Sequence, residues 1–143
     1  MALTPINYAV EEDDVLVEEL DDYAQPSKTW RIDLEKGRIH SFIDDKEAIR
    51  QYIRKALMTS RNRYLIYDDF YGEEIRDLIG HNLTQQLMDV EIPRLVREAI
   101  IYDDRIESVP NVIVTQYGSD GIHVAITVEL TNGELLTEEV AIK

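Results

Sequence analysis

The chain of 143 residues contains no cysteine, and its three histidines are scattered. The missing cysteine excludes disulfide bonds and thiolate metal ligands. His40, His81 and His123 lie too far apart in the sequence to resemble a ligand cluster. We therefore expect neither a structural metal nor a cofactor.

Long hydrophobic runs are also missing. No stretch approaches the ~20 consecutive apolar residues that a membrane-spanning helix needs. The first residues, Met1 to Pro5, lack the basic flank and apolar segment of a secretion signal. We expect no membrane partner and a protein that is made and kept in the cytoplasm.

Positive charge is scarce, since the formal net charge is −14. The first 25 residues hold eight carboxylates and no lysine or arginine, which leaves −6 for the remainder. Because like charges resist compaction, we interpret residues 1–26 as an acidic N-terminal arm and residues 27–143 as one domain. Apolar residues from Val10 to Tyr23 interrupt the carboxylates. The arm could become ordered against another surface, or it could be a solvated tail.

An acidic protein repels phosphate backbones, so we expect no nucleic-acid partner. One local basic patch could favour DNA binding. Charge complementarity also fits the same patch to an acidic arm, either this chain's own or a neighbour's. The patch consists of Arg50, Arg54, Lys55, Arg61 and Arg63.

The first half of the domain has the pattern of a hairpin followed by helices. Residues 28–41 alternate around Gly37, which tolerates the positive φ of a tight turn. Residues 45–58 place apolar side chains on one helical face and basic ones on the other. A short helix is expected near residues 73–79.

The second half predicts a helix and then a meander. Apolar spacing favours a helix over residues 91–102 with Pro93 in its first turn, and residues 83–90 could form a separate short helix. Strands are expected at 111–117, 122–131 and 134–142, with Asn132-Gly133 as a hairpin turn. The fold class is α+β: an N-terminal β-hairpin, two main amphipathic helices and a C-terminal antiparallel β-meander forming one small sheet.

The last predicted strand leaves a sheet edge open. Unpaired N–H and C=O groups there could dock a strand from another chain, which makes Glu138, Val140 and Ile142 candidate partner-binding residues. Alternatively, Glu138, Glu139 and Lys143 keep a solvated edge from pairing.

Tyrosines and arginines gather between the predicted helices, in residues 61–76. These residue types are enriched at the energetic centres of protein interfaces. Arg61, Tyr67 and Tyr71 are therefore candidate partner-binding residues. For Tyr67 and Tyr71, packing in the core with the hydroxyl at the rim is the alternative.

Residues 28–143 resemble the sheath initiators, wedge proteins of contractile-tail baseplates, in the form found in prophage-like and bacteriocin-type tail clusters. The motifs that carry the resemblance are Trp30-Arg31-Ile32-Asp33, Gly37-Arg38-Ile39, Ala48-Ile49-Arg50-Gln51, Thr59-Ser60-Arg61, Ile66-Tyr67, Tyr71-Gly72-Glu73-Glu74, Leu78-Ile79-Gly80 and Tyr102-Asp103-Asp104-Arg105-Ile106.

The resemblance implies a structural protein present in several copies around the tail tube. It would bind other wedge proteins and start the sheath by strand exchange with sheath subunits. The family's Glu-Pro-Arg tripeptide corresponds here to Asp103-Asp104-Arg105, which keeps the acid and the arginine but not the proline. The resemblance makes Asp103, Asp104 and Arg105 candidate partner-binding residues. Arg105 could pair with a partner's carboxylate or with Asp103 or Asp104 in its own loop.

A cell-wall-degrading tail glycosidase is the alternative function. Its acid and base could come from the paired carboxylates Asp68-Asp69, Glu73-Glu74 or Asp103-Asp104. Adjacent carboxylates usually point apart, and such pairs are more often a solvated face. No nucleophilic triad, phosphate loop or zinc signature stands out. We interpret the protein as a non-enzyme.

Overall fold

Residues 27–119 and 121–143 are described by a computed structural model. They form five strands, two α-helices and one short 3-10 helix, which confirms the α+β class. The predicted acidic arm lies outside the described residues. The first two strands make a separate two-stranded sheet, and the last three make an antiparallel sheet in the order β3-β4-β5.

The N-terminal hairpin consists of β1 (Thr29–Asp33) and β2 (Arg38–Ile43). Gly37 has φ +60° in the connecting turn, which explains why glycine stands there. An extra residue, Ser41, bulges out of β2 opposite Trp30 and Arg31. The bulge keeps Ile39 and Phe42 on the same face of the hairpin, although they are three residues apart.

Helix α1 (Asp45–Met58) begins where the sequence predicts it, with Asp44 as its N-cap. The core side of α1 carries Ala48, Ile49, Ile53, Ala56 and Leu57. The connection to α2 contains the 3-10 helix η1 (Ile75–Leu78), in place of the short helix expected there.

Helix α2 (Gln85–Ile100) corrects the prediction of two helices. Thr84 caps its N-terminus by accepting a hydrogen bond from the Leu87 N–H, so Pro93 lies in the middle of the helix and not in its first turn. A buried stripe runs past the proline from Met88 to Ile100. Burial of that stripe outweighs the one backbone hydrogen bond that Pro93 cannot donate.

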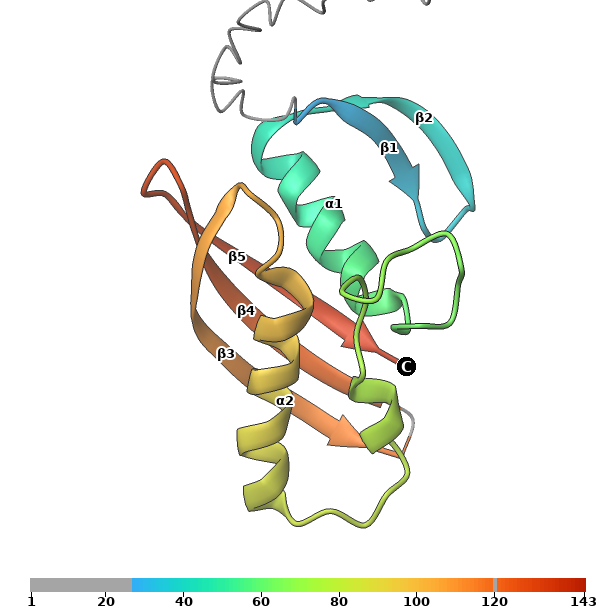
Figure 1. Cartoon of the computed structure of the whole chain (residues 1–143), viewed down its shortest axis with the longest axis vertical. Helices are drawn as coiled ribbons and strands as arrows, with labels where there is room; N and C mark the ends of the chain where they lie inside the picture. The colour runs from blue at the N-terminus through green and yellow to red at the C-terminus, as the bar shows by residue number, and fades with distance from the viewer. Residues whose placement is uncertain (1–26, 120) are drawn as a thin grey trace, which may run out of the picture.

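The C-terminal sheet contains β3 (Ile106–Gly118), β4 (Gly121–Leu130) and β5 (Leu135–Ile142). The three strands confirm the predicted meander, although β3 begins five residues earlier than the expected 111. Helices α1 and α2 pack across one face of this sheet, α2 against β3 and α1 against β5 (Figure 1). Alternate residues of β4 and β5 are buried under the helices, so the core lies between these two layers.

The loop from Thr59 to Glu74 folds back on the end of α1. An isolated bridge pairs Ser60 with Glu73. Gly72 adopts φ +105° there, and a Cβ atom at Gly72 would lie 2.6 Å from the Thr59 carbonyl oxygen. No other residue fits this position without moving the backbone, so the close approach of the two ends of the loop depends on glycine here.

Candidate functional site

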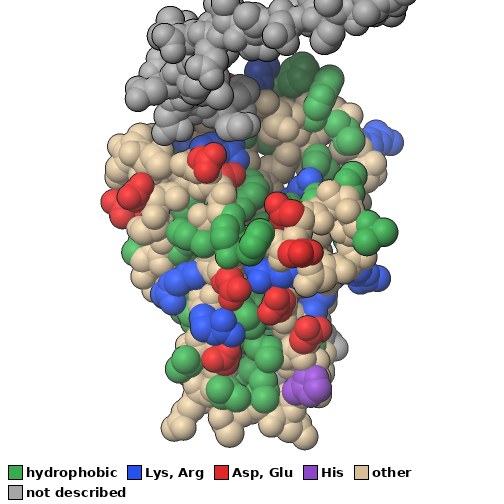
Figure 2. Space-filling view, in the orientation of Figure 1, with side chains coloured by type: hydrophobic (Ala, Val, Ile, Leu, Met, Phe, Trp, Pro, Cys, Tyr) green, Lys and Arg blue, Asp and Glu red, His purple; other side chains and the backbone are tan. Residues whose placement is uncertain are grey.

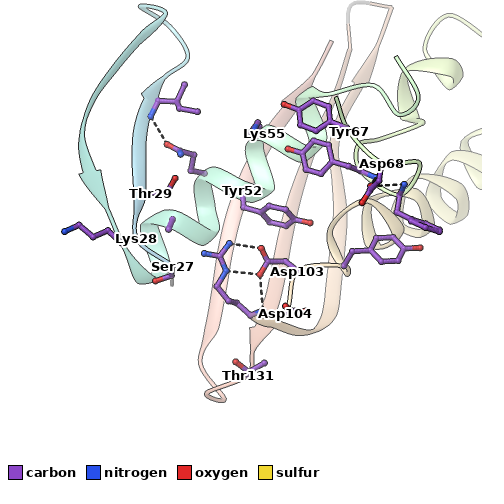
Figure 3. Close-up of a pocket in the computed structure, with 17 residues that line it drawn as sticks. Ser27, Lys28, Thr29, Tyr52, Lys55, Tyr67, Asp68, Asp103, Asp104 and Thr131 are labelled. Carbon is purple, nitrogen blue, oxygen red and sulfur yellow. Dashed lines mark hydrogen bonds and ion pairs between the residues drawn. The ribbon is translucent and has the colours of Figure 1, made fainter. Parts of the chain in front are cut away.

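One groove collects five of the residues predicted to bind a partner: Tyr67, Tyr71, Asp103, Asp104 and Arg105. It has a volume of about 960 Å³ and lies between the start of the hairpin, α1, the 59–74 loop and the connection from α2 to β3 (Figure 3). The other lining residues are Ser27, Lys28, Thr29, Ile32, Ala48, Gln51, Tyr52, Lys55, Asp68, Phe70, Tyr102 and Thr131.

Aromatic rings form much of the groove wall. The rings of Tyr67 and Tyr71 lie 4.4 Å apart between centroids, and Tyr52 is 6.5 Å from Tyr71. At the rim, Phe70 and Tyr102 are 5.5 Å apart and more than half exposed. Paired aromatics with accessible faces are typical of protein-binding sites.

The hydroxyls of Tyr52 and Tyr71 in the groove are neutral at physiological pH. Burial raises the pKa of Tyr71 to about 12, and burial likewise raises the pKa of Tyr52. The ammonium group of Lys55 makes a cation–π contact with the groove, since its Nζ lies 5.3 Å from the centre of the Tyr67 ring. Tyr67 and Tyr71 are both half-buried and line the groove. Tyr71 packs against the core, and Tyr67 packs on the Tyr71 ring.

Arg105 forms a two-pronged ion pair within its own turn. Its Nε and Nη2 donate to the two carboxylate oxygens of Asp103 at 2.8 and 2.7 Å, and its backbone N–H donates to Asp103 Oδ1 at 2.9 Å. Of the two roles left open by the sequence, the intramolecular one is present. The neighbouring Asp104 is exposed and lines the groove.

The turn made by Asp103-Asp104-Arg105 is also tied to the rest of the domain. The Ile106 N–H donates to the Asp103 carbonyl at 3.0 Å, and the Thr131 N–H donates to the Arg105 carbonyl at 3.1 Å. These bonds connect the end of α2 with the turn between β4 and β5. The ion pair therefore stabilises the turn that carries Asp104, one of the residues lining the groove.

Asp103 makes the stability of the fold depend on pH. Burial would raise the pKa of Asp103, but the hydrogen bonds and charge of Arg105 outweigh burial and lower it below 3.8. A lowered folded-state pKa stabilises the fold above the unfolded value and loses that effect as the pH falls through the folded value. We expect Asp103→Asn to lower the free energy of unfolding at pH 7 and to make no difference well below pH 3.8. Urea unfolding of both proteins across this range measures the difference. A constant difference would assign the effect to shape and not to charge.

Arg61 lies beside the groove with its guanidinium buried. Its side chain is 8% exposed and bonds to Glu74 and Glu98, both at 3.1 Å, and to the Gly72 carbonyl. These contacts hold the 59–74 loop against α2. The partner-binding role expected for Arg61 would thus be indirect, through the loop that carries Tyr67 and Tyr71.

The three β5 candidates, Glu138, Val140 and Ile142, have buried side chains that face the helices. Glu138 is 6% exposed and pairs with Arg54 of α1, while Arg50 lies 3.8 Å from its other oxygen. Glu138 therefore does not guard a solvated edge. Their side chains are therefore not accessible to a partner, and only the main chain of β5 could bind one.

The pairing of β5 determines which main-chain groups face outward. The Leu130 N–H donates to the Glu134 carbonyl at 2.9 Å, and the register continues without a shift from there to Ile142. Since hydrogen-bonded pairs alternate along an antiparallel ladder, residues 136, 138, 140 and 142 bond to β4. The N–H and C=O groups that point away from β4 belong to Leu135, Thr137, Glu139 and Ala141.

The opposite edge of the sheet is less suited to pairing. Strand β3 contains Pro110, which has no N–H, and its register against β4 shifts at three places. Proline and bulges are common protections of an edge strand. Within the described part of the chain, β5 is thus the more regular of the two edges of this sheet.

The paired carboxylates serve structural roles. Asp68 accepts the N–H groups of Phe70 and Tyr71, Glu74 pairs with Arg61, and Asp103 pairs with Arg105. Burial raises the pKa of Glu73, as a general acid requires, but Glu73 packs against Arg76 and does not line the groove. Of these paired carboxylates, the one whose pKa burial raises therefore lies outside the groove, so it cannot act there as a general acid.

Sequence reasoning missed part of this site. The sequence pattern puts Tyr52 on the apolar face of the helix expected over residues 45–58 and Tyr102 at the end of the helix expected over residues 91–102. Their spacing gave no sign that they would meet, because the groove combines segments far apart in the chain. Among residues 27–119 and 121–143, no group of His, Cys, Asp and Glu could hold a metal ion, and no helix is long and apolar enough to span a membrane.

The described residues form a small α+β protein whose two distinctive surface features are the groove lined by aromatic rings and the regular edge of β5. The sequence profile of the contractile injection system sheath initiators matches residues 13–133, and the chain belongs to this family. It is also 42% identical, over 98% of its length and 96% of the relative's, to the phage-like element PBSX protein XkdS of Bacillus subtilis strain 168. The protein is therefore a structural component of a phage-type contractile tail.

A solved structure supports the fold alone. A chain from Geobacter sulfurreducens, provisionally named as a tail lysozyme, superposes with a TM-score of 0.59 at 20% identity. The match covers 71% of the present chain and 93% of the other. At this identity, the name of that protein gives no information on catalysis here. The family and the Bacillus relative point to a structural protein and not to an enzyme.

Proposed function

We propose that this protein is a non-enzymatic baseplate subunit that starts sheath assembly by β-strand augmentation. A strand from a subunit of the first sheath ring would add to the outer edge of β5. Assembly would take place in the host cytoplasm, with several copies arranged around the tail tube. Nucleic acid and membrane have no part in this proposal.

The observation that carries the proposal is the regular outer edge of β5. Its outward-facing N–H and C=O groups come from four alternate residues in unbroken register. An added strand would satisfy these groups by main-chain hydrogen bonds, which fix its register without any chemical reaction. The irregular β3 edge explains why addition would occur on one side only.

Glu139→Pro tests the edge directly. Residue 139 has an exposed side chain and an N–H that points away from β4, so proline leaves the internal ladder intact. The change removes one bond to the added strand and places a ring against it, which we expect to weaken its binding about tenfold or more. Electron microscopy of reconstituted tails would show baseplates that contain the protein but lack extended sheaths.

Glu139→Ala is the matched control, because it removes the same side chain and keeps the N–H. It should support sheaths like the wild type. If the proline variant also supports normal sheaths while remaining folded by circular dichroism, augmentation at β5 is wrong.

The groove is the second proposed surface, and its partner would be another protein of the baseplate wedge. Its half-exposed aromatics and the displayed Asp104 have the mixed composition of an interface centre. Figure 2 shows hydrophobic, basic and acidic side chains interspersed on the face that carries the helices. The ion pair of Arg105 with Asp103 would keep this surface in shape before the partner arrives.

Asp104→Lys tests the groove, with Asp69→Lys as its control. Both aspartates are exposed and both changes reverse one charge, but Asp69 does not line the groove. We expect Asp104→Lys to lower incorporation into the wedge about tenfold or more, because a buried like-charge or unpaired contact costs about 1–3 kcal/mol. Quantitative immunoblots of purified baseplates measure incorporation. Equal incorporation of the two variants would place the wedge contact elsewhere.

A further inference from the structure

The N-terminal hairpin exposes one apolar face. Trp30 and Phe42 are cross-strand neighbours with ring centroids 4.1 Å apart, and Ile39 lies on the same face opposite Ile32. Trp30 is 54%, Phe42 53% and Ile39 68% exposed. Figure 2 shows hydrophobic side chains on the surface over β1 and β2. A contiguous exposed patch of large apolar side chains marks a binding surface.

The hairpin that carries this face is rich in cations. Lys28 lies over the Phe42 ring at 5.0 Å, on the apolar face itself, and Lys36 is exposed in the turn. Arg38 is also exposed, but it pairs in register with Asp33 on the opposite face. Within the described residues, no carboxylate forms an ion pair with any of these three side chains. An occupant of this face should therefore combine apolar side chains with negative charge.

The edges of the hairpin are less suitable for the same occupant. Gln51 of α1 already donates to the Trp30 carbonyl and accepts the Ile32 N–H, both at 2.8 Å, along the outer edge of β1. The bulge at Ser41 interrupts β2. Docking onto the face, and not addition of a third strand, suits this geometry.

We propose that residues 10–23 of the same chain cover the apolar face of the hairpin. This segment combines apolar residues such as Val15, Leu16 and Val17 with eight carboxylates and no cation. It lies within the 28 residues that precede β1, so its effective concentration at the hairpin is high. The family profile begins at residue 13, which places most of the segment within the part shared by the family.

Trp30 reports on this contact, because it is the single tryptophan of the chain. The test compares acrylamide quenching of its emission in the full chain and in a full chain with Val15, Leu16 and Val17 changed to serine. We expect the substitutions to raise the quenching constant about twofold and to shift the emission to longer wavelength, since a covered indole becomes exposed. The buried core of the described domain begins at Ile43, so the fold should persist by circular dichroism.

Leu3→Ser with Ile6→Ser is the matched control, since both residues lie in the same arm but outside residues 10–23; this variant should quench like the wild type. A charge comparison adds a second readout: Lys28→Glu, over the apolar face itself, should increase quenching, whereas Lys143→Glu, just beyond the end of β5 and away from the hairpin, should not (Figure 1). Equal quenching of the serine variant and the wild type would overturn the proposal. So would protection that disappears over about a hundred-fold dilution, because the occupant would then be a second copy.

Discussion

A chain that ends at Gly133 is expected to lose its fold. Removing the following residues takes away the whole of β5, which pairs with β4 along its length. It also removes Leu136, Val140 and Ile142 from the core and exposes the facing side of α1. Large-to-small changes at single core positions cost about 2–5 kcal/mol, and an entire domain is stable by only about 5–15 kcal/mol.

Circular dichroism and thermal unfolding of the truncated chain measure this loss. We expect no cooperative transition in the truncated chain and a wild-type transition when Lys143 alone is removed. A truncated chain that still unfolds cooperatively would show that β5 is an accessory to the domain and not part of its core.

This expectation changes how sheath initiation can be tested. The sequence predicts that the last strand leaves a sheet edge open, and removing this strand would be the simplest way to remove the edge. The buried side chains of β5 form part of the core. A truncated chain that fails to start a sheath could therefore have lost its fold, its templating edge or both. A single proline at residue 139 separates the two.

The fold was largely predictable where local signals agree with burial. Asp44 caps α1, the strict alternation of β4 gives one buried face, and Asn132-Gly133 forms the predicted hairpin turn. Each of these features depends on residues close together in sequence. The error at α2 arose because Pro93 was given more weight than the apolar stripe that continues past it.

The groove was only partly predictable. Asp103 and Arg105 are two residues apart, so their pairing could be named as one of two possibilities. The approach of Tyr52 from α1 and Tyr102 from the end of α2 depends on how the helices cross, which no local pattern records. The same holds for Glu138, whose burial depends on a contact with Arg54 from another element.

Arg54→Ala is expected to destabilise the fold strongly, although Arg54 itself is about half exposed. The reason is its partner, because the Glu138 side chain is 6% exposed and cannot recover the lost ion pair from bulk water. Arg50, at 3.8 Å, is left as a weaker partner. We expect a loss of about 2–4 kcal/mol in the free energy of unfolding, measured by urea denaturation at neutral pH.

Arg94→Ala provides the control on the same scale. Arg94 also pairs with two glutamates, Glu91 and Glu98, but these pairs are solvent-accessible and should contribute less than about 1 kcal/mol. Changing Arg54 to Met and Glu138 to Leu together should restore much of the stability, because the isolated buried charge is then gone. If Arg54→Ala costs no more than Arg94→Ala, the ion pair does not hold α1 against β5. The β5 edge would then owe its rigidity to the apolar core alone.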